Sequence, residues 1–213
     1  MDMRTRPILG TIRLKWADPA LVRGLLLAAA FLGGGLLGRW YAAGWSGAQA
    51  EELAAYLADY CRVYEDGGAA PSLGGCLWLY LGPGVLTFLL GFASLGVILI
   101  PALAGALGFS AMYAVSCFVQ SYGRYGAVLA MGLLGVRMLF TVPCFFLLAS
   151  QAWPLSTDLA ALALGRGKRS APVLYRSRYF LLFFLCVLCL AAGVCCERFL
   201  TPLLFRLALR GLP

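Results

Sequence analysis

Residues 67–123 contain no charged side chain, and this run of 57 residues constrains the fold more than any other feature of the sequence. A soluble domain carries roughly 25% charged residues, which cover its water-facing surface. This chain carries 12%, and 62% of its residues are apolar or aromatic. Because a helix crosses a bilayer with about 20 apolar residues, the run is long enough for more than one crossing. The sequence therefore predicts an all-α, polytopic membrane protein rather than a soluble enzyme.

The first apolar segment, residues 21–43, is predicted to be a transmembrane anchor that follows a cytoplasmic N-terminal segment, residues 1–20. Its basic start and the stretch Ala48-Gln49-Ala50 downstream also resemble a secretory signal with a cleavage site. However, the leader before the apolar part is long for such a signal, and the small residues follow only about 10 residues after that part. An uncleaved anchor is therefore the preferred interpretation.

The remainder of the chain, residues 75–213, is predicted to be a four-helix membrane block. The apolar stretch of residues 74–151 has room for three helices of about 25 residues, and residues 179–196 provide the last crossing. Residues 200–209 are too short and too basic to cross, so this C-terminal tail is expected to lie in the membrane interface. Breaks between the three helices are expected at Pro83, at Pro101 and at residues 121–123, before Arg124.

Loop charges predict the side of the membrane on which each loop lies. Residues 1–23 carry five basic and two acidic side chains, residues 45–74 carry one basic and five acidic ones, and residues 151–178 carry five basic and one acidic. By the positive-inside rule, the first and third of these are cytoplasmic, including a loop at 152–178, and the segment 44–74 is extracytoplasmic. Five transmembrane helices satisfy these constraints, with the N-terminus in the cytoplasm and the C-terminus outside.

Within the extracytoplasmic segment, residues 47–66 have the periodicity of an amphipathic helix. Leu57, Tyr60 and Tyr64 fall on one face, and the charged residues fall mostly elsewhere. This helix can be a docking surface for an extracytoplasmic partner, or it can lie on the membrane surface of the protein itself, and the sequence supports both equally. Cys61 and Cys76 flank the loop and can form a disulfide if the compartment is oxidising.

The chain contains no histidine and no asparagine. Without histidine there is no Ser-His or Cys-His couple and no His-ligated metal. None of the nine carboxylates falls in the middle of an apolar run, which excludes a buried aspartyl pair. The basic residues lie at the ends of apolar runs, where membrane topology and not nucleic-acid binding explains them. The sequence therefore predicts no catalytic residue, no cofactor, no metal and no nucleic-acid partner, and it predicts a lipid bilayer as the surroundings.

Small side chains inside the spans are predicted to serve packing. Cys186 and Cys189 have the spacing of a redox or metal pair, but they lie in the middle of an apolar span, where cysteine behaves as a small hydrophobe. Ala30, Gly34 and Gly38 recur every four residues in the first span, and such stripes let helix backbones approach closely. Packing within the monomer is preferred over a homo- or hetero-oligomer interface. The same helix-packing role is assigned to Gly91, Gly96 and Gly108.

Arg137 is the one charge predicted to lie deep inside a span. It follows Arg124 by 13 residues, which puts it ~20 Å into the layer. A charge at that depth costs roughly 2.5–3.5 kcal/mol on insertion scales, so it should face protein or water. No carboxylate is expected at that depth, because Glu197 lies at the outer end of the last span. The expected partners are carbonyls, hydroxyls, water or another subunit, in either a structural or a functional role.

A series of short stretches runs through residues 80–205: Leu90-Gly-Phe-Ala-Ser-Leu-Gly96 followed by Pro101, Gly108-Phe-Ser, Ser121-Tyr-Gly-Arg-Tyr-Gly126, Pro143, and Glu197-Arg-Phe-Leu-Thr-Pro202. In their order and spacing they resemble the stage II sporulation protein M family. The layout of one anchor, one extracytoplasmic segment and a four-helix block also matches that family. The chain differs from the family at Leu107, where a basic residue is common, and at Val136-Arg137-Met138, where the family often has Pro-Gln-Asn.

The resemblance implies a non-enzymatic scaffold of the engulfment machinery in endospore formation. It implies a protein of the septal or engulfing cell membrane that recruits two peptidoglycan-cleaving partners, stage II sporulation proteins D and P. The alternative is a membrane-embedded subunit of a transporter of the ABC permease type, in which Arg137 would suit an anion pathway or a subunit contact. An intramembrane enzyme is the third hypothesis, against which the lack of histidine and of buried carboxylates argues.

Overall fold

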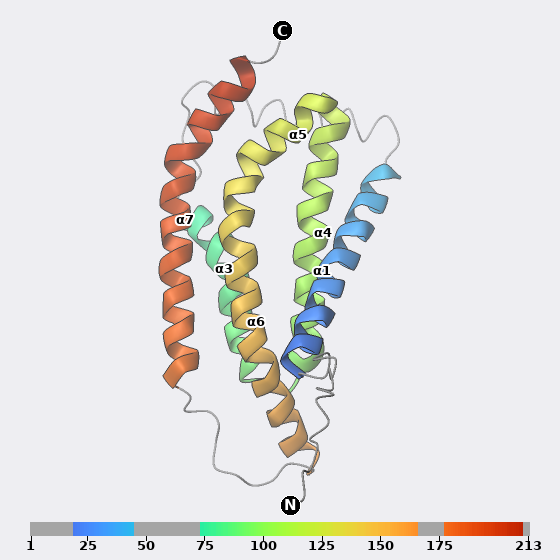
Figure 1. Cartoon of the computed structure of the whole chain (residues 1–213), viewed down its shortest axis with the longest axis vertical. Coiled ribbons are helices and arrows are strands. Elements are labelled where there is room, and N and C mark those ends of the chain that lie inside the picture. Colours follow the sequence, from blue (N-terminus) through green and yellow to red (C-terminus); the bar gives the residue numbers. More distant parts are fainter. Residues whose placement is uncertain (1–18, 45–72, 166–176, 211–213) are drawn as a thin grey trace, which may run out of the picture.

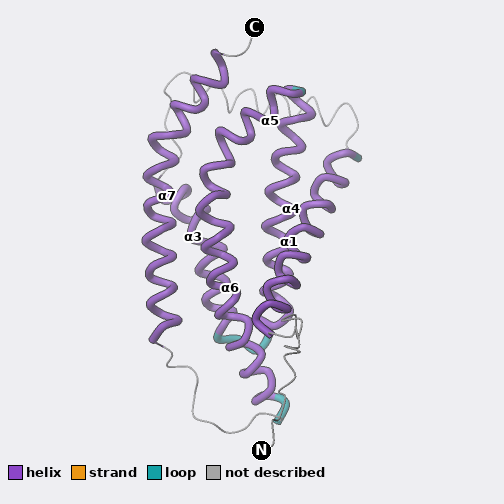
Figure 2. Tube along the Cα trace, viewed as in Figure 1, coloured by secondary structure: helices purple, strands orange, loops and turns teal. Residues whose placement is uncertain are grey.

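The computed structural model describes residues 19–44, 73–165 and 177–210. These parts of the chain form helices that run alternately up and down one long axis (Figure 1). No strand occurs within the described ranges (Figure 2), and the predicted all-α class is confirmed for them. The helical elements are α1 (Pro19–Ala43), α3 (Leu73–Gly91), α4 (Gly96–Tyr122), α5 (Arg124–Ala130), the π-helical segment η2 (Met131–Gly135), α6 (Val136–Ala163) and α7 (Ser177–Arg210).

Four of these helices are long and apolar enough to cross a membrane, which indicates a membrane-embedded protein. Large apolar side chains lie on their outer faces, and Leu36, Trp40 and Leu188 each expose at least 70% of their surface. Helix α3 was expected to be one of the five crossings, but its apolar part is only Leu77–Gly91, which is shorter than the about 20 residues of a full crossing. Figure 1 shows α3 beginning well below the upper end of its neighbours. The four long segments are Ala20–Ala43, Gly96–Ser121, Val136–Ala163 and Arg178–Glu197.

Two of the three expected helix breaks are wrong. Pro83 lies inside α3 and Pro101 inside α4. The break between these two helices falls instead at residues 92–95, where short-range backbone hydrogen bonds such as Phe92 N–H to Leu89 O form the turn. The break after α4 is at Gly123, as expected, and its φ of 60° is a conformation that glycine adopts without strain.

Helices α6 and α7 both extend further than the apolar pattern predicts. Helix α6 continues to Ala163, so residues 152–163 of the expected cytoplasmic loop are helical. Helix α7 is continuous from Ser177 to Arg210, so residues 200–209 prolong the last helix instead of forming a separate element. Apolar periodicity marks the part of a helix that lies in lipid, whereas the hydrogen-bonded backbone can continue beyond it.

Helix α1 packs on α4 through glycines. A Cβ atom on Gly34 would overlap the carbonyl of Gly105, and one on Gly38 would overlap the carbonyl of Phe109. From the other side, a Cβ on Gly108 would overlap the carbonyl of Phe31. The two backbones are therefore in direct contact, which is the geometry that small residues permit in membrane helix pairs. The structure places this glycine stripe inside one chain.

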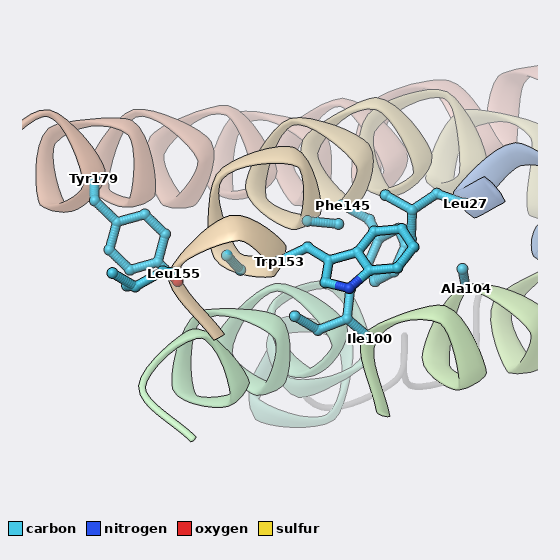
Figure 3. Close-up of a cluster of buried hydrophobic side chains, with 9 residues drawn as sticks. Leu27, Ile100, Ala104, Phe145, Trp153, Leu155 and Tyr179 are labelled. Atoms are coloured by element: carbon cyan, nitrogen blue, oxygen red, sulfur yellow. The ribbon is translucent and has the colours of Figure 1, made fainter. Parts of the chain in front are cut away.

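Among the residues that the structure describes, two clusters of buried side chains join the helices. The first, drawn in Figure 3, brings Leu27 of α1 and Ile100 of α4 against Phe145 and Trp153 of α6. The second lies between α3, α6 and α7, and it contains Tyr80, Cys144, Leu148, Cys186, Leu190 and Val194. Helix α6 contributes to both clusters, so it is the element on which the two sides of the bundle meet.

The contact of α1 with α4 can be tested at two adjacent glycines. Gly34 is buried against Gly105, whereas nothing lies within 4 Å of a Cβ on Gly33. We expect Gly34→Leu to lower the melting temperature in detergent by more than about 5 °C, because the α4 backbone cannot move out of the way of the new side chain. Gly33→Leu is the matched control and should leave it nearly unchanged. Equal effects of the two substitutions would contradict the packing described.

Candidate functional site

Helix α3 contains a backbone carbonyl that its own helix cannot satisfy. In an α-helix, the carbonyl of Leu79 accepts from the N–H four residues later, but that residue is Pro83, which has no N–H. In the structure the guanidinium of Arg137, on α6, donates from Nη2 to this Leu79 oxygen at 3.2 Å. A hydrogen bond from a charged donor is stronger than one between neutral groups. Arg137 was expected to need an acceptor such as a carbonyl. It donates to the Leu79 carbonyl, which has no donor within α3 because residue 83 is proline.

The rest of the Arg137 side chain also faces α3. Its Cζ lies 6.0 Å from the centre of the Tyr80 ring, within the range of a cation–π contact. Tyr80 is 1% exposed and fills the space between α3, α6 and α7. Leu139, two residues further along α6, exposes 71% of its surface on the other side of that helix. The charge of Arg137 is thus directed into the bundle, as its insertion cost requires.

The π-helical segment η2 determines which way Arg137 faces. Met131, within η2, and Leu139 are both more than 70% exposed, although they are eight residues apart. In a regular α-helix, residues seven apart share a face, and residues eight apart are turned by about 80°. A π-bulge accommodates one extra residue, which brings Met131 and Leu139 back onto one outer face. Arg137 is consequently turned inward, toward α3.

Glu197 lies closer to the level of Arg137 than the sequence suggested. Gly193 of α7 packs against the rings of Phe140 and Tyr80, and a Cβ there would lie 2.9 Å from Phe140 Cγ. Helices α6 and α7 are antiparallel (Figure 1). The residue one turn after Gly193, Glu197, therefore lies at about the same height as the residue one turn before Phe140, Arg137. The expectation that no carboxylate is available at that depth is therefore corrected, because Glu197 is about level with Arg137 on the neighbouring helix.

The turn between α3 and α4 is held by hydroxyl groups from two other helices. Tyr179 of α7 donates from its hydroxyl to the carbonyl of Phe88 at 2.9 Å, and Ser156 of α6 donates to the carbonyl of Ala93 at 2.7 Å. The Phe88 carbonyl lies in the last turn of α3, where a carbonyl finds no donor within the helix and needs one from elsewhere when it is buried. The Ala93 carbonyl lies in the turn and also accepts from the N–H of Gly96, so Ser156 is its second donor. Gly91 and Gly96 lie where these side chains enter, since a Cβ on Gly91 would overlap the Tyr179 hydroxyl and one on Gly96 would lie 2.7 Å from Ser156 Oγ.

The C-terminal end of α1 is held in the same manner. Gln120 of α4 donates from Nε2 to the carbonyl of Ala42 at 2.9 Å. Nearby, the ring of Tyr41 lies 6.1 Å from that of Phe109 and 6.0 Å from that of Tyr113, between ring centres. The last turns of α1 are thus attached to α4 at the point where the chain leaves toward residue 45.

The cysteines of α6 and α7 pack within the second cluster. Cys186 Sγ lies 4.0 Å from the carbonyl oxygen of Cys144, and both side chains are buried. Within residues 19–44, 73–165 and 177–210, no group of three or more His, Cys, Asp or Glu side chains is arranged to hold a metal ion. Leu57, Tyr60, Tyr64 and Cys61 lie outside the described residues, and of Cys76 only the backbone, in α3, is described.

The donors to the helix-end carbonyls were not predicted from the sequence. Gln120, Ser156 and Tyr179 are polar side chains in or beside apolar spans, and no motif distinguishes them. The signal that could have found them is chemical: each released carbonyl in a bilayer needs a donor, and few polar side chains are available to supply one.

No family model, no curated protein and no solved structure matches the chain. The geometry of the chain itself, together with the resemblance of its short stretches, is therefore the basis for proposing a function.

The role of the Tyr179 hydroxyl can be tested by removing that hydroxyl alone. We expect Tyr179→Phe to lower the free energy of unfolding by about 1–3 kcal/mol, because the buried Phe88 carbonyl then loses its donor. Tyr41→Phe is the control, since Tyr41 is 55% exposed. The measurement is equilibrium unfolding of the purified protein in mixed micelles. An effect of Tyr179→Phe no larger than that of the control would show that this hydrogen bond does not hold the turn.

Proposed function

We propose that this chain is a non-enzymatic membrane scaffold that presents residues 45–72 to extracytoplasmic, peptidoglycan-degrading partners during engulfment in endospore formation. The resemblance of residues 80–205 to the stage II sporulation protein M family supplies the biological setting. It also suggests the partners, stage II sporulation proteins D and P. The observation that carries the proposal is that α1 and α3, the helices on either side of residues 45–72, are both held by hydrogen bonds from other helices.

On one side of this segment, α1 ends against α4. The Gly38 backbone lies on Phe109, and Gln120 holds the carbonyl of Ala42 at 2.9 Å. On the other side, α3 is attached to α6 six residues after its first residue, where Arg137 donates to the carbonyl of Leu79 at 3.2 Å. A segment whose ends are already held loses less conformational entropy when a partner binds it. This arrangement suits a protein whose task is to display a binding segment.

The proposed orientation places the lower end of the bundle in Figure 1 in the cytoplasm. Helix α1 begins, α6 ends and α7 begins at this end. The adjoining stretches, residues 1–18 and 166–176, carry more basic than acidic side chains. The positive-inside rule then assigns this end to the cytoplasm and residues 45–72 to the outside, where peptidoglycan-degrading partners act.

The transporter alternative has less support from the geometry. It depended on Arg137 facing an anion pathway or another subunit. In the structure the Arg137 side chain faces α3, with its guanidinium on the Leu79 carbonyl and beside the Tyr80 ring. These contacts lie within the chain and give the guanidinium an acceptor and an aromatic neighbour on α3.

Recruitment can be tested on the predicted face of residues 47–66. We expect simultaneous replacement of Leu57, Tyr60 and Tyr64 by alanine to reduce co-purification of the peptidoglycan hydrolases from sporulating cells at least about tenfold, because aromatic anchors dominate many interfaces. Membrane insertion should be unchanged. The matched control replaces Glu52 and Asp59, on other faces of the same predicted helix, by alanine.

Two results would contradict this proposal. One is normal hydrolase binding by the triple variant together with loss of binding by Gly34→Leu, which would place recruitment in the membrane helices. The other is release of peptidoglycan fragments by the purified chain alone, which would make it an enzyme and not a scaffold.

A further inference from the structure

We propose that Cys144 of α6 and Cys189 of α7 form a redox site inside the membrane, at which a lipid-soluble quinone oxidises the two thiols to a disulfide. The site rests on the packing of α6 against α7 and does not depend on the proposed function. Oxidation would add a covalent bond to the packed cluster that already joins these two helices to α3.

The packing of α6 against α7 places Cys144 and Cys189 at about the same height. Gly193 of α7 lies against the ring of Phe140 of α6, and the two helices are antiparallel (Figure 1). The residue one turn before Gly193 is Cys189, and the residue one turn after Phe140 is Cys144. These two cysteines therefore lie level with each other on facing helices.

The thiols of the two helices are in contact. The Cys144 thiol lies within hydrogen-bonding reach of the Cys189 thiol and of the Cys186 thiol. Cys186 Sγ also lies 4.0 Å from the Cys144 carbonyl oxygen, so the side chains of α7 reach the backbone of α6 here. A disulfide joins Cα atoms about 4.4–6.8 Å apart, a separation that such close packing permits. The structure thus adds a third cysteine, Cys144, to the pair on α7 that the sequence had singled out.

Cys189 differs from the other two cysteines in its access to lipid. Cys144 and Cys186 are 4% and 3% exposed, whereas Cys189 is exposed on the outer face of α7. Cys189 lies inside the apolar segment Arg178–Glu197, at roughly 12–16 Å from either end by the rise of a helix. Since the hydrocarbon core is about 30 Å thick, this is near its centre. A water-soluble oxidant is excluded at that depth, whereas a quinone dissolved in the hydrocarbon can reach the Cys189 thiol.

The reaction balances with one quinone and two thiols. The Cys189 sulfur adds to the quinone ring, and its proton passes to one quinone oxygen. The Cys144 sulfur then attacks the Cys189 sulfur, so that the sulfur–sulfur bond forms as the carbon–sulfur bond breaks. The electron pair of the broken bond stays on the ring, and the Cys144 proton passes to the second oxygen. Because apolar surroundings disfavour a free thiolate, each proton has to move in the step in which its sulfur reacts. The products are the disulfide and a hydroquinone.

The test uses variants of the full chain in nanodiscs that keep two of the eight cysteines and carry alanine at the others. The variant of interest keeps Cys144 and Cys189. The matched control keeps Cys144 and Cys195, since Cys195 is also exposed on α7 but lies roughly 9 Å further along that helix. A third variant keeps Cys144 and the buried Cys186. Each is incubated with decylubiquinone, a lipid-soluble benzoquinone, or with tetrathionate, a water-soluble anionic oxidant. Free thiols are then alkylated, and linked peptides are identified by mass spectrometry.

We expect decylubiquinone to convert most of the Cys144–Cys189 variant to the disulfide, with an equal amount of hydroquinone formed. The variant with Cys186 should react at least about tenfold more slowly, because thiol oxidation depends on access and Cys186 is buried. The control with Cys195 should stay reduced. Tetrathionate should oxidise the Cys144–Cys189 pair at least about tenfold more slowly than the quinone does, since it does not enter the hydrocarbon.

Three results would overturn the proposal. They are the absence of a quinone-dependent disulfide between Cys144 and Cys189, equal oxidation of the control with Cys195, or equal rates with tetrathionate and quinone. If the alanine substitutions lower the melting temperature, the same linked peptides are sought in the unmodified chain, where their absence after quinone treatment would contradict the proposal equally. No partner is present in this experiment, so its failure is distinct from a failure of the proposed recruitment.

Discussion

A backbone carbonyl in a bilayer must find its donor within the protein, and the structure of this chain follows from how that requirement is met. Where α3 is interrupted by Pro83, the donor is Arg137, and where it ends, the donors are Tyr179 and Ser156. Where α1 ends, the donor is Gln120. Each of these side chains comes from a different helix than the carbonyl it serves, so the same bonds that satisfy the backbone also fix the helices to one another.

The requirement explains why a charge can be tolerated inside the bundle. Burying an arginine in a membrane span costs free energy unless polar groups interact with its charge. Burying a carbonyl that has lost its helical donor to a proline also costs free energy unless another donor binds it. The hydrogen bond between the Arg137 guanidinium and the Leu79 carbonyl lowers both costs together. The glycines between α1 and α4 allow the backbones of these two helices to lie in direct contact. The polar contacts thus set the register of the helices, and small residues and the two apolar clusters supply the packing.

Composition and periodicity were sufficient to predict an all-α membrane protein, because the charge-free run admits few other folds. They also singled out Arg137 and Gly34, whose chemistry is unusual for a span. They could not predict that Pro83 and Pro101 remain inside helices. At Pro83 this outcome involves a donor from another helix, the guanidinium of Arg137. Nor could they show that η2 is π-helical, that α3 is short, or that Glu197 is level with Arg137, because each results from helices packing against each other. The predicted face of Leu57, Tyr60 and Tyr64 remains a prediction.

The contact between the Arg137 guanidinium and the Leu79 carbonyl can be measured directly in a bilayer. The measurement is a solid-state NMR distance between the ¹³C-labelled leucine carbonyls and the ¹⁵N-labelled arginine guanidinium groups of the reconstituted protein. We expect a measurable carbon–nitrogen dipolar coupling, because the nitrogen lies 3.2 Å from the carbonyl oxygen. This coupling should be lost both in Leu79→Val and in Arg137→Met. The absence of such a coupling, or a coupling that survives in both variants, would show that the arginine does not serve the carbonyl released by Pro83.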